Sequence, residues 1–148
     1  MTNPTARKFG WPATLIAEYG HWLVLLRPAQ ATLGALVVAC KDEASAFSAI
    51  SPQAFTELAS VTADVEATLG KFNPYARINW LMLMMVDRDV HFHVLPRYDA
   101  PQSFAGYAFP DPGWPGPPEL SRAVTLDPET SGKLTATLKA LWPKRDRG

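Results

Sequence analysis

The sequence predicts an α+β fold, in which one long helix packs on an antiparallel five-stranded sheet and a second helix lies near the C-terminus. Short runs of bulky apolar and β-branched residues, separated by turn-forming residues, predict the strands. A single long segment with apolar residues at helical spacing stands between two groups of strands. This order favours an antiparallel meander over repeated βαβ units.

Each expected strand is a short apolar run. The runs are Thr14–Tyr19, His21–Leu26 and Gly34–Cys40 before the long helix, and Arg77–Val86, Val90–Pro96 and a late Arg122–Leu126 after it. The second and third runs are close enough in sequence to pair as a hairpin with a longer loop. We expect a tight turn at 87–89 to connect the fourth run to the fifth.

The long helix has clear start and stop signals. Ser51 is placed to be the N-cap, and Pro52 suits the first helical position, where a missing N–H is harmless. Gly70 is the residue type that commonly follows a helix. The helix is therefore predicted over Pro52–Leu69, and a C-terminal helix over about 128–142, after Asp127.

Composition limits the classes of protein that fit. The chain has 148 residues, which is the usual size of a single domain, and we assign one domain to 1–148. The formal net charge is +0, so the basic surface that binds duplex nucleic acid is not expected. One cysteine and no apolar leader or membrane span suggest a cytoplasmic protein. The segment 101–118 is rich in Pro and aromatic residues, and we expect an ordered excursion.

Two histidines stand two residues apart in the fifth apolar run. Because strand residues alternate between faces, Val90, Phe92 and Val94 should point into the core. Asp89, His91 and His93 should then form a row on the other face, which core packing does not explain. Imidazole is a nucleophile, an acid or base, and a hydrogen-bond donor to phosphate near neutral pH. Arg97 follows closely, and a guanidinium suits phosphate oxygens.

The segment HFHVLPR, residues 91–97, resembles the signature of the histidine-triad superfamily, His-φ-His-φ-His-φ-φ, in which φ is apolar. The order of hairpin, helix, strand and strand over about 15–97 is similar to that family's order. The resemblance implies a histidine-triad-like fold and the activity of a diadenosine polyphosphate hydrolase. In such enzymes the middle histidine, here His91, attacks an α-phosphate, and water then releases the mononucleotide from the nucleotidyl-histidine.

The sequence departs from this signature at several positions. Asp89 replaces the first histidine of the triad, and Leu33-Gly34-Ala35 replaces a Pro-Gly-His segment. We expect the Asp89 carboxylate either to orient an imidazole, as in hydrolase triads, or simply to end the turn. Asn79 corresponds to a substrate-binding asparagine of the family, and Arg97 is a further candidate for phosphate contact.

We therefore expect a hydrolase acting on a nucleoside phosphate ester, anhydride or phosphoramidate, with His91, His93 and Asp89 as its catalytic residues. Two alternatives remain at this point. The first is a nucleotide-binding module with little or no turnover, and the second is a metal site formed by Asp89, His91 and His93. The resemblance implies no cofactor, a mononucleotide or dinucleotide as substrate, and a homodimer.

Overall fold

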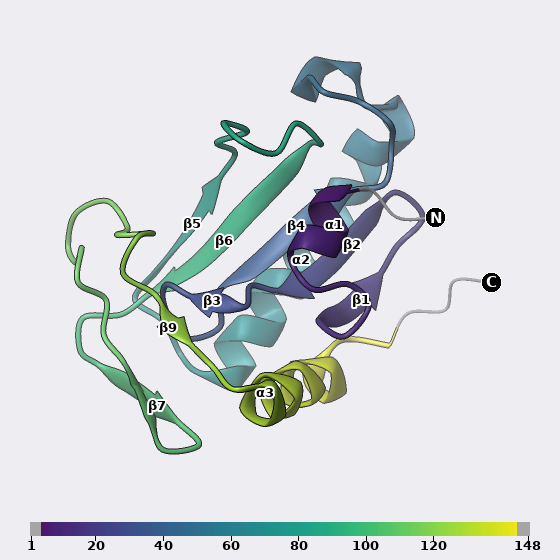
Figure 1. Cartoon of the computed structure of the whole chain (residues 1–148). Coiled ribbons are helices and arrows are strands. Elements are labelled where there is room, and N and C mark those ends of the chain that lie inside the picture. Colours follow the sequence, from purple (N-terminus) through teal and green to yellow (C-terminus); the bar gives the residue numbers. More distant parts are fainter. Residues whose placement is uncertain (1–3, 145–148) are drawn as a thin grey trace.

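The computed structural model describes residues 4–144. Its helices are α1 (Pro4–Lys8), α2 (Pro52–Phe72) and α3 (Pro128–Leu141), with a 3-10 turn η1 (Phe47–Ala49). Its strands are β1 (Leu15–Glu18), β2 (Trp22–Leu26), β3 (Ala29–Gln30), β4 (Leu36–Cys40), β5 (Arg77–Leu81), β6 (His91–Arg97), β7 (Gln102–Phe104), β8 (Tyr107–Phe109) and β9 (Val124–Thr125). Figure 1 shows α1 in front of the main sheet and α2 behind it.

The main sheet has five antiparallel strands in the order β1-β2-β4-β6-β5. Alternating residues of its central strands divide between two layers. One set packs with Val61, Val65 and Leu69 of α2 and with Leu134 and Leu138 of α3 in the main core. The opposite set, which includes Leu25 and Val37, packs with Ala6 of α1. The expected α+β fold is confirmed, and both sheet faces are covered near β2 and β4.

The long helix begins where the sequence predicts and ends three residues later. The Ser51 side chain accepts a hydrogen bond from Ala54 N, and Pro52 is the first helical residue. Helix α2 passes through Gly70 to Phe72, and the N–H of Asn73 closes it by donating to the Leu69 carbonyl. Phe72 packs against the main core, which favours the extra residues.

The prediction for the fourth strand was too long. Strand β5 ends at Leu81, which pairs with His93, and the chain then leaves the sheet. Met84 takes a left-handed φ of 51°, which is incompatible with a continuing strand. Residues 82–90 therefore form a long loop, and the tight turn expected at 87–89 is replaced by this loop.

The segment after β6 is ordered but separate from the main sheet. Strands β7 and β8 form a two-stranded hairpin within the Pro-rich segment, and Phe109 is buried against the main core. The expected late strand is short: β9 pairs only with β3. Helix α3 starts at the expected N-cap, Asp127, which accepts a hydrogen bond from Thr130 N. None of the helices within 4–144 is long and apolar enough to span a membrane.

Candidate active site

Strand β6 carries both histidines on the sheet face that α1 covers. His91 pairs across the sheet with Ala39, and His93 pairs with Val37, so both side chains share the face of Val37. Val90 and Val94 lie in the main core on the other face, as the alternation predicts. The two imidazole ring centres are 5.2 Å apart, with the rings at 77°. They are close enough to act on one phosphorus centre.

A backbone carbonyl fixes the orientation of His91. Its Nδ1 lies 2.6 Å from the carbonyl oxygen of Asp89. Because a carbonyl only accepts hydrogen bonds, Nδ1 carries the proton and Nε2 holds a lone pair. The orienting contact that the sequence suggested for the Asp89 carboxylate is thus made by the Asp89 backbone instead. The carboxylate accepts hydrogen bonds from Thr5, at 2.9 Å from Oγ1 and 3.3 Å from N.

His93 has the opposite hydrogen-bonding arrangement. Its Nδ1 accepts a hydrogen bond from Nε of Arg27 at 3.4 Å, which leaves the ring proton on Nε2. Burial, followed by the positive charge of Arg27, lowers the pKa of His93 to about 4. His93 is therefore a neutral imidazole at pH 7, suited to donate a hydrogen bond rather than a proton.

Helix α1 and the loop 82–90 cover the imidazoles. Phe9 packs on both rings, with ring centres 6.2 Å from His91 and 5.6 Å from His93. Lys8 Nζ forms an ion pair with Asp87 at 2.8 Å. Together with the Thr5–Asp89 contact, this pair ties α1 to the loop. His91 is only 2% exposed and His93 8% exposed, so α1 and the loop 82–90 leave little of either ring open to solvent.

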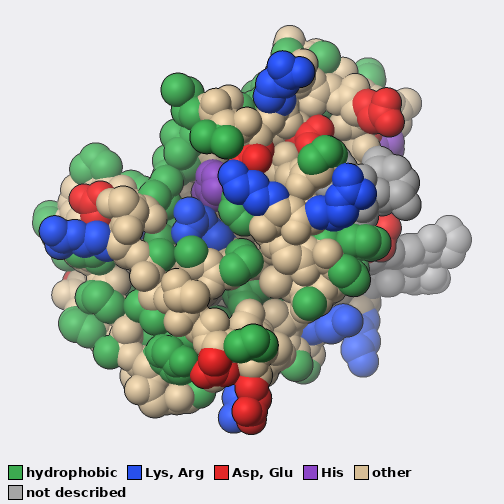
Figure 2. Space-filling model, viewed as in Figure 1, with side chains coloured by type: hydrophobic (Ala, Val, Ile, Leu, Met, Phe, Trp, Pro, Cys, Tyr) green, Lys and Arg blue, Asp and Glu red, His purple; other side chains and the backbone are tan. Residues whose placement is uncertain are grey.

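A cavity of about 290 Å³ lies beside the two imidazoles. Besides the histidines, its lining combines two cations and one carboxylate with an apolar wall: Lys8, Phe9, Arg27, Leu83, Met84, Met85, Val86, Asp87 and Leu120. In Figure 2 a small histidine surface is visible beside Lys and Arg side chains, on the face that carries α1. Met85, which lies within the run 77–86 expected to be a strand, is instead a loop residue that is 85% exposed. The cavity thus offers positive charge next to the histidines and apolar surface around them.

Arg97 and Asn79, both expected at the substrate, do not line the histidine cavity but lie together at another cleft, of about 530 Å³, beside Trp114. Arg97 makes two hydrogen bonds to the Asp111 carboxylate, at 2.7 and 2.9 Å, and a third to Asn79 Oδ1 at 2.8 Å. Its side chain is 4% exposed and that of Asp111 is 3% exposed. Arg97 lies four positions after His93 on the strand, which is a distance of about 13 Å between their Cα atoms. This network anchors the Pro-rich segment to β6.

Sequence reasoning missed three residues beside the histidines: Lys8, Phe9 and Arg27. Helix α1, which leads into Phe9, has five residues, too few for a periodicity signal. Arg27 follows β2 directly, and the strand register alone could have placed it near His93. The metal alternative finds no support, because no three His, Cys, Asp or Glu side chains among 4–144 are placed to hold a metal ion.

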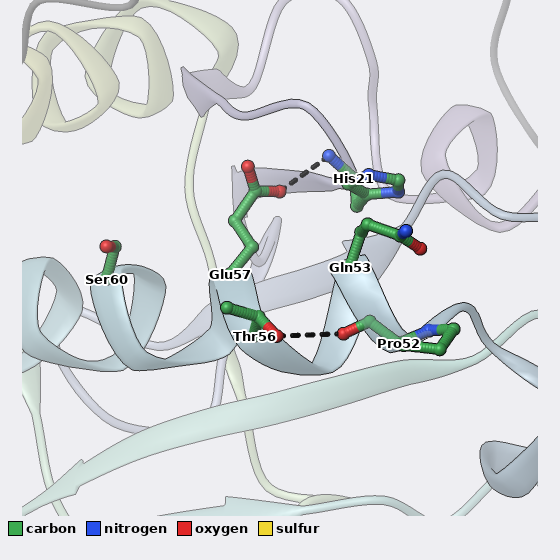
Figure 3. A pocket seen from close by; sticks show the side chains of 6 residues that line it. All are labelled: His21, Pro52, Gln53, Thr56, Glu57 and Ser60. Atoms are coloured by element: carbon green, nitrogen blue, oxygen red, sulfur yellow. Dashed lines mark hydrogen bonds between the residues drawn. The ribbon is translucent and has the colours of Figure 1, made fainter.

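A second cleft, of about 510 Å³, lies at the start of α2 (Figure 3). Its polar groups are largely occupied by internal contacts. The Glu57 carboxylate accepts hydrogen bonds from the backbone N–H groups of Gly20 and His21. His21 Nδ1 contacts Asp42, whose other oxygen accepts from Ser51 N. These contacts tie the β1–β2 turn to α2, and we assign the cleft a structural role.

Comparison with solved structures shows the same architecture in histidine triad proteins. One from Sinorhizobium meliloti 1021 has 21% identity and a TM-score of 0.72, over 93% of each chain. One from Bradyrhizobium japonicum has 13% identity and a TM-score of 0.72, over 95% of this chain and 96% of that one. This chain has the histidine-triad fold. A third, from Marinobacter aquaeolei VT8, has 18% identity and a TM-score of 0.70, over 86% and 87% of the chains.

The sequence by itself does not show the family. No family model matches the chain, and no curated protein matches it. The likeness to solved structures therefore establishes the fold alone.

Proposed function

We propose that the chain is a histidine-triad hydrolase that cleaves a nucleoside phosphate ester, anhydride or phosphoramidate at its α-phosphate. One observation carries this proposal: two adjacent imidazoles are held in opposite tautomers at one cavity. His91 presents a lone pair at Nε2, and His93 presents an N–H at Nε2. A nucleophile beside a hydrogen-bond donor is what phosphoryl transfer through a covalent intermediate requires.

The proposed first step forms a phosphorus–nitrogen bond to His91. The Nε2 lone pair attacks the α-phosphorus, and the bond to the leaving group breaks with its electron pair, which solvent then protonates. His91 keeps its Nδ1 proton, and the Asp89 carbonyl stabilises the resulting imidazolium. His93 donates a hydrogen bond to a non-bridging phosphate oxygen. Water then attacks phosphorus and loses a proton to solvent. The phosphorus–nitrogen bond breaks, its electron pair returns to Nε2 of His91, and the mononucleotide is released.

The cavity supports a phosphate ligand of modest size. Its volume of about 290 Å³ lies near the lower end of the range, roughly 300–1,000 Å³, of small-molecule sites. Arg27 supplies the positive charge that Arg97 does not, whereas the charge of Lys8 is balanced by Asp87. The exposed apolar loop side chains Leu83 and Met85 are suited to contact the less polar part of a nucleotide.

Trapping the covalent intermediate tests the proposal directly. We expect the protein, mixed with an adenosine phosphoramidate or a dinucleoside polyphosphate and quenched, to carry one nucleotidyl group on the peptide containing His91. His91→Ala should abolish both adduct and product. His21→Ala is the matched control, because His21 lies at the other cleft, and it should leave both unchanged.

The alternative of a nucleotide-binding module is favoured by one observation, the structural use of Asp89 at the first position of the triad. Mononucleotide binding without adduct or product would establish that module, and absence of binding would refute both proposals. We also propose a homodimer and a cytoplasmic location. A monomeric mass in solution scattering would contradict the dimer.

A further inference from the structure

Arg27 occupies the position next to the missing Pro-Gly-His histidine. Its N–H donates to the carbonyl of Ala35 at 3.0 Å, so the two residues face each other across neighbouring strands. Ala35 stands where the Pro-Gly-His segment would have its histidine, and its side chain is a single methyl group. Ala35 is fully buried, and the Arg27 guanidinium reaches His93 on the next strand but one.

A buried glutamine fixes the backbone that carries Arg27. Gln30 is 0% exposed, and its Nε2 donates to the carbonyls of Arg27 at 2.7 Å and Ala35 at 2.9 Å. Its Oε1 accepts from Gly34 N at 2.8 Å. These three bonds use both N–H donors and the oxygen of the amide, and they hold the β2–β4 connection in place. The Arg27 side chain therefore starts from a fixed position.

The Arg27 guanidinium makes one hydrogen bond to the imidazole pair, to His93. Nη1 donates to the Ala29 carbonyl, and Nε donates to His93 Nδ1. Among residues 4–144 no carboxylate lies within ion-pair distance of Arg27. Because a guanidinium has no lone pair to offer, it can contact Nδ1 of His93 only when that nitrogen is unprotonated.

We propose that Arg27 is a positioning residue of the site, which holds His93 as the neutral Nε2–H tautomer. Arg27 thereby makes His93 complementary to His91, so that one ring offers a lone pair and the other a donor. The catalytic consequence of this assignment rests on the proposed hydrolase function, whereas the assignment of the tautomer does not.

Nitrogen-15 NMR of the histidine side chains tests the inference without substrate. In the wild-type protein His93 should be protonated at Nε2 alone and His91 at Nδ1 alone. Arg27→Met removes both the hydrogen-bond donor to His93 Nδ1 and the positive charge beside it. In this variant His93 should populate both neutral tautomers. Its pKa should rise by about 1 unit or more, as expected when a like charge is removed. The groups that otherwise face His93 are His91, Asp87 and Lys8, and all three remain in this variant.

Two further variants make the experiment decisive. Arg27→Gln keeps a polar side chain and removes the charge, so the pKa of His93 should again rise. Arg77→Met removes an exposed arginine from β5 and should leave both histidines unchanged. The inference is overturned if wild-type His93 carries its proton on Nδ1. It is equally overturned if tautomer and pKa stay the same in a folded Arg27→Met or Arg27→Gln protein. Loss of hydrolysis in any variant has no bearing on this outcome.

Discussion

Replacing Asp111 by Asn tests the structural role of Arg97 in anchoring the Pro-rich segment. The substitution keeps the shape of the side chain and removes its charge, so it leaves a guanidinium that is only 4% exposed without a counter-ion. It also weakens two short hydrogen bonds to Arg97 and one, at 3.3 Å, from Tyr98 N. Breaking a buried pair from one side costs about 3–5 kcal/mol of unfolding free energy.

Urea denaturation measures this loss directly. For a chain of this size, about 3–5 kcal/mol corresponds to a fall of roughly 6–20 °C in Tm. Asp99→Asn, a matched change of an exposed carboxylate in the following turn, should stay within about 0.5 kcal/mol of wild type. The double variant Arg97→Met/Asp111→Leu should recover most of the loss, because it leaves no unpaired buried charge.

The same variants separate structural from substrate-binding roles. If Arg97 only anchors the Pro-rich segment, the double variant should bind mononucleotide with nearly wild-type affinity. The reasoning is refuted if Asp111→Asn costs less than about 1 kcal/mol, since a buried pair should cost more. It is also refuted if the folded double variant loses nucleotide binding, which would make Arg97 a ligand of the phosphate.

Three other predictions follow from contacts around the site. Thr5→Val removes the hydroxyl that donates a hydrogen bond to the Asp89 carboxylate, a bond worth about 1.5–3 kcal/mol. Helix α1 should then detach from the loop more often. Amide hydrogen exchange should become faster near Phe9 while α2 stays protected. The pKa of His93 is about 4, below its unfolded value near 6.5. As pH falls, the unfolded chain therefore takes up this proton before the folded chain does. The unfolding free energy should fall as pH drops from about 6.5 toward 4. If the unfolding free energy of His93→Asn falls equally over this pH range, the prediction is wrong. Burial raises the pKa of the Cys40 thiol to about 11, so a thiol reagent should modify it only after unfolding.

The placement of the two histidines on one face of β6 could be predicted from sequence, because successive strand residues alternate between faces. A strand period of two residues places His91 and His93 together and sends Val90 and Val94 into the core, whatever the rest of the chain does. Capping chemistry likewise located the starts of α2 and α3. These features depend on local rules, and the structure confirms them.

The parts that depend on distant contacts could not be predicted. Nothing near Asp89 in sequence indicates that its carboxylate contacts Thr5, and Arg97 looks free until Asp111 is placed beside it. The end of β5 was also misjudged, because the apolar residues after Leu81 have the composition of a strand but form a loop over the histidines. Gly70 resembles a helix stop and yet lies inside α2, whose last turn packs Phe72 on the core.

The contacts that enclose the histidines have a consequence for the order of folding. Thr5 meets Asp89 across 84 residues, Lys8 meets Asp87 across 79, and Arg27 meets His93 across 66. Closing such long loops costs chain entropy before any contact offsets it, so they form after local hairpins and helices. The cover over the paired imidazoles therefore forms only near the end of folding. In a partly folded chain, for instance one still emerging from the ribosome, both imidazoles would still be open to solvent.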